Sequence, residues 1–125
     1  MPIAISLEEN NGLDSGVSTI FGRCSYYMFI DPKTMIFVIE ENPARNASGG
    51  AGIQAAQFIV DKQCSALISG QLGPKAQSVL ASAGIPVFAC PGGTAREALA
   101  AFADNKLEVL IAPNASAHSG PSPRL

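Results

Sequence analysis

Short apolar runs with the character of β-strands recur along this chain. They occupy Ile3–Leu7, Tyr26–Ile30, Met35–Ile39, Ala66–Ile68 and Pro86–Ala89. Only Asp31-Pro32-Lys33-Thr34 separates the second run from the third, and these turn-forming residues predict an antiparallel hairpin. The chain therefore opens with three strands before any helical pattern begins.

Helical spacing follows the third, fourth and fifth runs. Apolar positions recur every three or four residues between about residues 50 and 62, and again after Pro74, a residue suited to the first turn of a helix. Thr94-Ala95-Arg96-Glu97 matches a capping box and predicts the start of a third helix. Residues 112–125 are rich in Pro, Ser and Asn and lack periodicity, so we expect a single domain at residues 1–111 and a disordered tail.

This order of elements predicts an α/β fold built on a mixed sheet of five strands. The hairpin is antiparallel, and each strand–helix–strand unit should form a right-handed parallel crossover. With the first strand in the centre, the strand order becomes 3-2-1-4-5, and strand two alone is antiparallel. The carboxyl ends of the other four strands then meet at one edge, where open α/β sheets bind ligands.

Four loops rich in glycine and small polar residues leave those carboxyl ends, at residues 10–16, 45–52, 69–73 and 90–94. Glycine allows sharp turns and lets a ligand approach backbone amides closely, especially where a helix begins. We therefore expect a binding site built largely from backbone. Its candidate residues are Asn11, Gly12, Asn46, Ser48, Gly49, Gly50, Gly70, Gln71, Gly92, Gly93 and Thr94.

Composition and charge argue against several classes of function. Ten acidic and eight basic residues leave a formal net charge of −2, which disfavours binding to nucleic acid. No apolar run approaches the ~20 residues of a membrane helix, and three cysteines without a close pair fit a reducing cytoplasm. Neither clustered acids for a two-metal nuclease nor a hydrolytic Ser/His/Asp set is present, so we do not expect an enzyme.

Four motifs occur in order on this framework: Phe21-Gly22-Arg23, Glu41-Asn42-Pro43, and the segments 50–57 (GAGIQAAQ) and 68–74 (ISGQLGP). Together they resemble the dinitrogenase iron–molybdenum cofactor biosynthesis family over residues 3 to about 107. The resemblance implies a ribonuclease H-like three-layer fold with the strand order given above. It also implies binding of metal–sulfur clusters, because some members handle iron–molybdenum cofactor precursors and the orange protein branch holds a molybdenum–copper sulfide cluster without covalent attachment.

Histidine and cysteine are the first side chains to consider for such a cargo. Some relatives place histidines in the loop after strand three, but this chain has none between residues 43 and 52. Cys24 and Cys90 fall at the expected binding edge, and a thiolate is a natural ligand for molybdenum, copper or iron. Strands two and five would lie about 14 Å apart at ~4.8 Å per strand, whereas one tetrahedral ion needs sulfurs only ~4 Å apart.

Cys24 and Cys90 are therefore not expected to share a single ion. Cys24, which follows Phe21-Gly22-Arg23, is the candidate metal ligand, and Cys64 falls at the opposite edge. The alternative for each cysteine is a small buried residue. Arg23 and Arg45 are the candidate cations, because guanidinium groups and helix N-terminal amides suit an anionic thiometallate. The alternative for each arginine is solvation, or pairing with Glu41 or Asp14.

Two functions from different classes fit these features. The first is a cytoplasmic, non-catalytic carrier of an anionic metal–sulfur cluster, of the Mo–Fe–S or Mo–Cu–S type. We expect such a carrier to act as a monomer and to exchange its cargo with a donor or acceptor protein, without nucleic acid or membrane. The second is a metal-free protein-interaction module that uses the same edge or the tail. Visible absorbance of the loaded protein would discriminate the two.

Overall fold

A mixed β-sheet of six strands forms the centre of the computed structural model, which describes residues 1–111. The strands are β1 (Ile3–Leu7), β2 (Tyr26–Ile30), β3 (Phe37–Glu41), β4 (Ala66–Ser69), β5 (Val87–Ala89) and β6 (Glu108–Ile111). β1, β4 and β5 are parallel to one another, whereas β2 is antiparallel to β1 and β3, and β6 is antiparallel to β5. The tail expected at residues 112–125 lies outside the described residues.

The strand order in the sheet is β3-β2-β1-β4-β5-β6. The expected order 3-2-1-4-5 with strand two reversed is therefore confirmed, but the expected number of five strands is wrong. β6 adds a sixth strand beside β5, and the pairing shifts register between Val87 and Phe88. The run at residues 108–111 is about as short as the predicted strands at 66–68 and 86–89, and its pairing with the free edge of β5 makes it a strand. The ribonuclease H-like classification stays a prediction.

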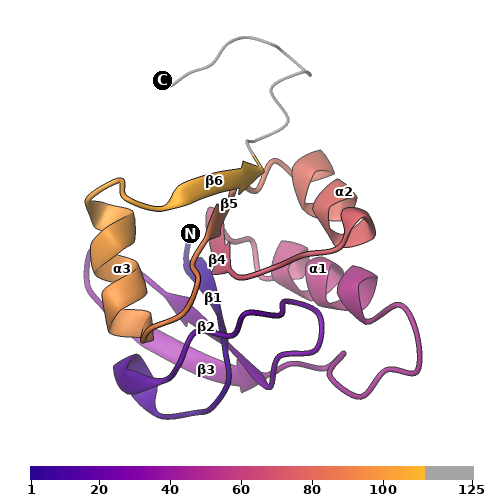
Figure 1. Cartoon of the computed structure of the whole chain (residues 1–125), viewed down its shortest axis with the longest axis horizontal. Coiled ribbons are helices and arrows are strands. Elements are labelled where there is room, and N and C mark those ends of the chain that lie inside the picture. Colours follow the sequence, from indigo (N-terminus) through magenta and orange to yellow (C-terminus); the bar gives the residue numbers. More distant parts are fainter. Residues whose placement is uncertain (112–125) are drawn as a thin grey trace, which may run out of the picture.

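Three helices cover the two faces of the sheet (Figure 1). The helices α1 (Ala51–Asp61) and α2 (Pro74–Ser82) lie on one face, where Ile59 and Leu80 pack with Tyr27 of β2. The helix α3 (Ala95–Ala103) lies on the other face, where Leu99 packs with Ile5 of β1. The fold thus has three layers, and it holds two separate apolar cores. Within residues 1–111, no helix has the length and apolar character needed to cross a membrane.

The turn between β2 and β3 is longer than the sequence suggests. β3 begins at Phe37 instead of Met35, because Met35 adopts a left-handed conformation (φ 63°) and its N–H donates to the Asp31 carbonyl (2.7 Å). Ile36 follows in the same turn and is 72% exposed. The hairpin itself is as expected.

Candidate functional site

Residues 15–21, here called the strap, cross the carboxyl edge of the sheet. The N–H of Ser18 donates to the Ser6 carbonyl at the end of β1 (2.8 Å), and the N–H of Gly70 after β4 donates to the Ser18 carbonyl (3.2 Å). Further along, the N–H of Phe21 donates to the Gln71 carbonyl (3.0 Å). The strap therefore occupies the place between β1 and β4 where the strand order reverses, and where ligands of open α/β sheets usually bind.

Gly70 shows how closely the strap packs on this edge. A Cβ atom at Gly70 would lie 2.3 Å from the Thr19 carbonyl oxygen. Beneath the strap, the Ser6 hydroxyl donates to Ser69 Oγ (2.8 Å) and also contacts the Ser18 carbonyl (3.2 Å), and these side chains are buried. The glycine at position 70 is needed for the chain's own backbone, so it does not offer an open amide to a ligand.

A hollow of about 500 Å³ lies beside the strap, between the N-terminal ends of α1 and α2. We call it the helix-end pocket. It brings together parts of two of the expected loops, 45–52 and 69–73, and part of the segment before β2. Its lining residues are Ile20, Gly22, Arg23, Gly50, Ala51, Gly52, Ile53, Gln71, Gly73, Pro74, Lys75 and Ala76.

The two helices that end at this pocket have no side-chain caps. α1 follows Gly50, which has φ 69°, and α2 follows Gly73; neither helix is capped by a side chain or carries an acidic residue in its first turn. By contrast, Thr94 and Glu97 close a complete capping box on α3. Uncapped N–H groups and the positive end of the helix dipole favour an anion. The pocket has two such ends.

Arg23 and Lys75 supply positive charge to the pocket. Arg23 Nη1 donates to the Ala47 carbonyl (2.8 Å) and lies 3.4 Å from the Arg45 carbonyl, which fixes the guanidinium against the loop leading to α1. Its remaining N–H groups can serve a ligand. Lys75 lies in the first turn of α2, where its charge opposes the helix dipole. That unfavourable position is visible in the sequence, but Lys75 was not among the expected site residues.

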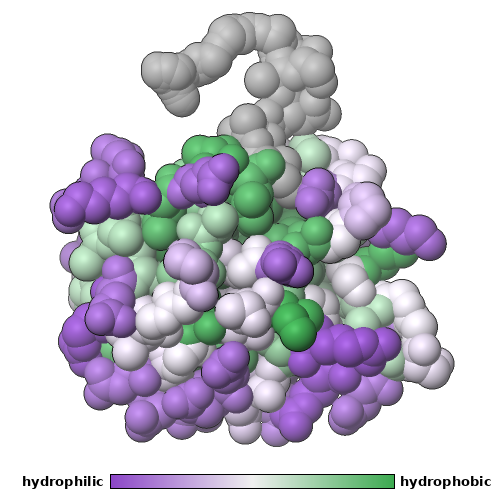
Figure 2. All heavy atoms as spheres, in the orientation of Figure 1, coloured by the Kyte–Doolittle hydropathy of each residue, from purple (hydrophilic) through white to green (hydrophobic). Residues whose placement is uncertain are grey.

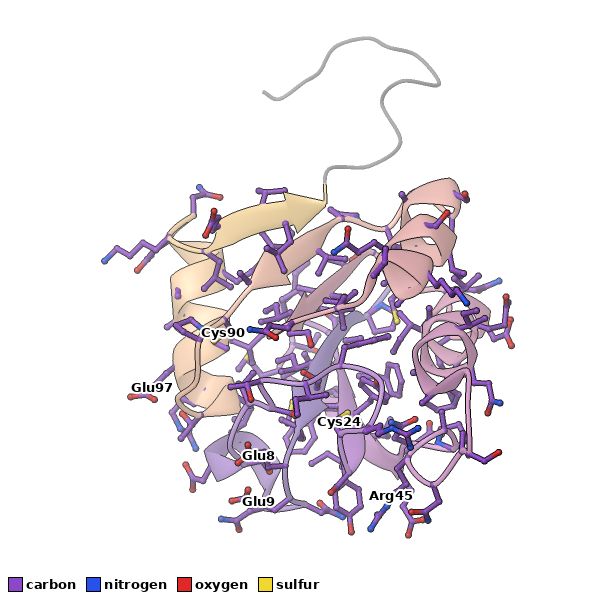
Figure 3. All side chains as sticks on the ribbon, turned by 45° about the vertical axis from the view of Figure 1, so that its right-hand side comes forward. Glu8, Glu9, Cys24, Arg45, Cys90 and Glu97 are labelled. Carbon is purple, nitrogen blue, oxygen red and sulfur yellow. The ribbon has the colours of Figure 1, made fainter. Side chains whose placement is uncertain are left out.

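The alternatives considered for the arginines involved ion pairs with Glu41 or Asp14. In the described part of the chain, the ion pairs are Lys62 with Glu40 (2.7 Å) and Arg96 with Asp14 (3.4 Å). Arg45 is exposed on its loop. In Figure 3, Glu8, Glu9 and Glu97 lie toward η1 (Gly12–Asp14) and α3, away from Arg45. Glu8, Glu9 and Glu97 therefore lie apart from Arg45.

Asn42 is a further site residue that motif reading noted without assigning it a role. It is buried, and its Nδ2 donates to the Gly22 carbonyl (2.9 Å) and the Cys24 carbonyl (3.0 Å), while its Oδ1 accepts the N–H of Ala44 (2.9 Å). Gly22 in turn meets Gly52, whose backbone would lie 3.0 Å from a Cβ at Gly22. Asn42 therefore holds the segment before β2 against the start of α1.

The cysteines lie outside the helix-end pocket. Cys24 is 4% exposed in the core under α1 and α2, and its thiol donates to the Tyr26 carbonyl (3.3 Å). Burial raises the pKa of Cys24 to about 11, so its thiol is protonated near neutral pH. Cys90 is 5% exposed in the core under α3 and donates to the Gly92 carbonyl (3.1 Å).

Cys24 and Cys90 therefore lie in opposite layers and well apart (Figure 3). Burial also raises the pKa of Cys64 to about 11. Among residues 1–111, no group of three or more His, Cys, Asp or Glu side chains could hold a metal ion. The helix-end pocket, with its N–H groups and cations, suits an anion.

The other candidate residues do not gather at the pocket. The N–H of Asn11 donates to Ser15 Oγ (2.7 Å), and Gly12 lies beside the ring of Phe37. The Gly93 carbonyl accepts the N–H of Val17, and the Thr94 hydroxyl caps α3. Three more candidates are exposed in the loop that leads to α1: Asn46, Ser48 and Gly49. Gly92 borders open space. Of the expected set, the pocket lining includes Arg23, Gly50 and Gln71.

A second hollow of about 570 Å³ lies between β6 and the start of α2. Its lining is mainly apolar, with Leu72, Leu107 and Leu110, and it includes Gly70, Gln71 and Cys90. Figure 2 shows hydrophobic side chains gathered over this part of the surface, and Val109 and Leu110 are 51% and 43% exposed. Arg23, Lys75 and the start of α1 do not line this hollow, so its chemistry differs from that of the helix-end pocket.

Comparison with known proteins agrees with this fold. Residues 1–105 match the sequence model of the family described as dinitrogenase iron-molybdenum cofactor. An uncharacterized protein of Methanocaldococcus jannaschii is 32% identical over 111 residues, which cover 86% of this chain and 90% of that protein.

Two solved structures are also similar. The apo form of the orange protein from Desulfovibrio gigas is 34% identical, with a TM-score of 0.83 over 90% of this chain and 95% of that chain. A NifB-type protein of Thermotoga is 33% identical, with a TM-score of 0.75 over 87% of this chain and 92% of that chain. The chain belongs to the dinitrogenase iron-molybdenum cofactor family.

Proposed function

We propose that this protein is a non-catalytic carrier of an anionic metal–sulfur cluster, and that the helix-end pocket binds the cluster. Membership of the dinitrogenase iron-molybdenum cofactor family and similarity to the orange protein support a role in binding or carrying a metal cluster. The observation that carries the proposed site is the meeting of two uncapped helix N-termini with Arg23 and Lys75. All of these features attract an anion.

The cluster is cargo, and the protein contacts its outer atoms. Backbone N–H groups of Ala51, Gly52 and Ile53 at α1, and of Lys75 and Ala76 at α2, can donate to its sulfur atoms; Pro74 has no N–H to offer. Cys24 is buried and does not line the pocket, so the proposed site includes no cysteine ligand. The cargo is an iron–molybdenum cofactor precursor or a molybdenum–copper sulfide cluster, which a donor or acceptor protein exchanges.

The test is to mix the metal-free protein with tetrathiomolybdate and copper(I), or with an isolated iron–molybdenum cluster, and to follow visible absorbance through gel filtration. We expect colour to co-elute with the protein. Removing both cations, in Arg23→Ala/Lys75→Ala, should weaken binding by about tenfold or more, since each charge acts beside a helix end. Lys33→Ala is the matched control, because Lys33 lies in the exposed β2–β3 turn.

Colour that elutes apart from the folded protein in every mixture would overturn the carrier role. It would favour the metal-free interaction module, for which the apolar hollow beside β6 is the surface at hand. Equal affinity in the double variant and in the wild type would keep the carrier role but remove the helix-end pocket as its site.

A further inference from the structure

The lining of the helix-end pocket combines positive charge with exposed apolar side chains. Ile20 is 59% exposed and Ile53 is 41% exposed, and both line the pocket beside Arg23 and Lys75. Within the described chain, this lining holds neither a hydroxyl nor a carboxylate side chain. The combination is unusual for a site that must hold an anion, because strongly hydrated anions lose water unfavourably against apolar surface.

Both isoleucines are held in place. Ile20 belongs to the strap, where its N–H and carbonyl both bond to the Ser18 hydroxyl (3.1 and 2.9 Å) and where it pairs with Gln71 in a short parallel bridge. Ile53 lies in the first turn of α1. Neither residue belongs to a loose loop, so a small backbone movement cannot bury either side chain in a core. Each side chain therefore presents its apolar surface to whatever enters the pocket.

We infer that the helix-end pocket selects sulfur-bearing anions over oxygen-bearing anions of the same charge and shape, and that Ile20 and Ile53 provide the selectivity. This inference rests on the proposed function and deepens it. Sulfur is larger, more polarizable and less strongly hydrated than oxygen, so it gains dispersion contacts with isoleucine at little cost in lost hydration. The helix ends and the two cations attract both kinds of anion, and the isoleucines distinguish them.

Tetrathiomolybdate and molybdate form the matched pair of probes, because they share the metal, the charge and the tetrahedral shape. Binding of each to the full chain is measured by equilibrium dialysis with molybdenum analysis. We expect tetrathiomolybdate to bind at least about tenfold more tightly than molybdate. Ile20→Ser and Ile53→Ser should each weaken the binding of tetrathiomolybdate by about three- to tenfold and leave the binding of molybdate unchanged, because each substitution removes only apolar contact. Lys75→Gln should weaken the binding of both anions.

Val38→Ser is the control variant, since Val38 is 55% exposed on β3 and does not line the pocket. Equal affinity for the two anions would overturn the selectivity while leaving the anion pocket in place. Failure of both anions to bind would overturn the pocket together with the selectivity. If Cys24→Ser lost the binding of tetrathiomolybdate while both isoleucine variants bound it normally, sulfur recognition would be assigned to the thiol. That result would overturn the role of Ile20 and Ile53.

Discussion

At the scale of single residues, Asn42 shows how a buried amide can organise a site that it does not line. Its side chain satisfies the carbonyls of Gly22 and Cys24 and the N–H of Ala44. Asn42→Ala should lower the free energy of unfolding by about 2–3 kcal/mol, because it leaves these backbone groups unpaired in a buried place. Urea denaturation measures the loss.

The exposed Asn46 is the matched control for Asn42. Asn46→Ala changes the same chemical group in the loop that leads to α1, and we expect a change within about 0.5 kcal/mol. Equal effects of the two substitutions would show that the Asn42 hydrogen bonds contribute little to the stability of the protein.

Gly70 and Gly49 make a second comparison at the residue scale. Gly70→Ala should cost more than about 2 kcal/mol and loosen the strap, because its new methyl group would overlap the Thr19 backbone. Gly49→Ala should be neutral or slightly stabilising, by up to about 1 kcal/mol, because nothing lies within 4 Å of its Cβ position. Thermal and urea unfolding of both variants tests the contrast, and a stable Gly70→Ala protein would contradict the close approach.

These two glycines also show what a sequence can reveal about a site. Both occur in glycine-rich loops after strands, and from the sequence alone both were expected to expose amides to a ligand. Only the folded chain distinguishes Gly70, which accommodates the strap, from Gly49, which has open space around it. The distinction depends on contacts between residues about fifty positions apart, and no local pattern records them. Lys75 is different, because its place in the first turn of a helix could have been noticed.

At the scale of elements, the predictions succeeded where local chemistry sets a boundary. Pro74 begins α2 and the Thr94–Glu97 capping box begins α3, as expected. They failed where pairing decides: β3 starts two residues late because Met35 turns left-handed, and β6 exists because β5 offers it a free edge. The capping contrast between the helices is equally informative, since α3 is closed by its own side chains while α1 and α2 are open.

Thr94→Ala tests this contrast. Loss of the cap should lower the stability of the protein by about 1 kcal/mol, because an N–H at the start of α3 loses its partner. Cluster binding should be unchanged, since Thr94 does not line the helix-end pocket. The two readouts are chemical denaturation and co-elution of visible absorbance. Weakened binding in a folded Thr94→Ala variant would extend the site toward α3.

At the scale of the whole molecule, the two cores keep the thiols away from solvent. Cys24, Cys64 and Cys90 are all buried. Iodoacetamide at about pH 8 should therefore leave the native protein unmodified, whereas the denatured protein should gain three labels, as mass spectrometry would show. Cluster binding should survive the treatment, because the proposed pocket uses no thiol. If native Cys24 were labelled and cluster binding were lost, the Cys24 thiol would belong to the binding site after all.

The same burial makes stability depend on alkaline pH. Burial raises the pKa of Cys24 and of Cys64 from 9.0 to about 11, and it also raises the pKa of Tyr27. Well below pH 9 these groups are protonated in both states, so they add no pH dependence there. Above pH 9 the unfolded chain loses thiol protons that the folded chain still holds, so the free energy of unfolding should fall as pH rises toward 11.

Urea unfolding at several pH values between about 7 and 11 measures this slope. Cys24→Ala/Cys64→Ala should flatten the decline without abolishing it, because the buried Tyr27 hydroxyl still ionises more readily in the unfolded chain. The slope is taken for each variant relative to its own stability at the lowest pH, so the packing lost in the double variant does not affect the comparison. An unchanged slope in the double variant would mean that the two thiols ionise as easily in the folded protein as in the unfolded one, and that the core around them admits water.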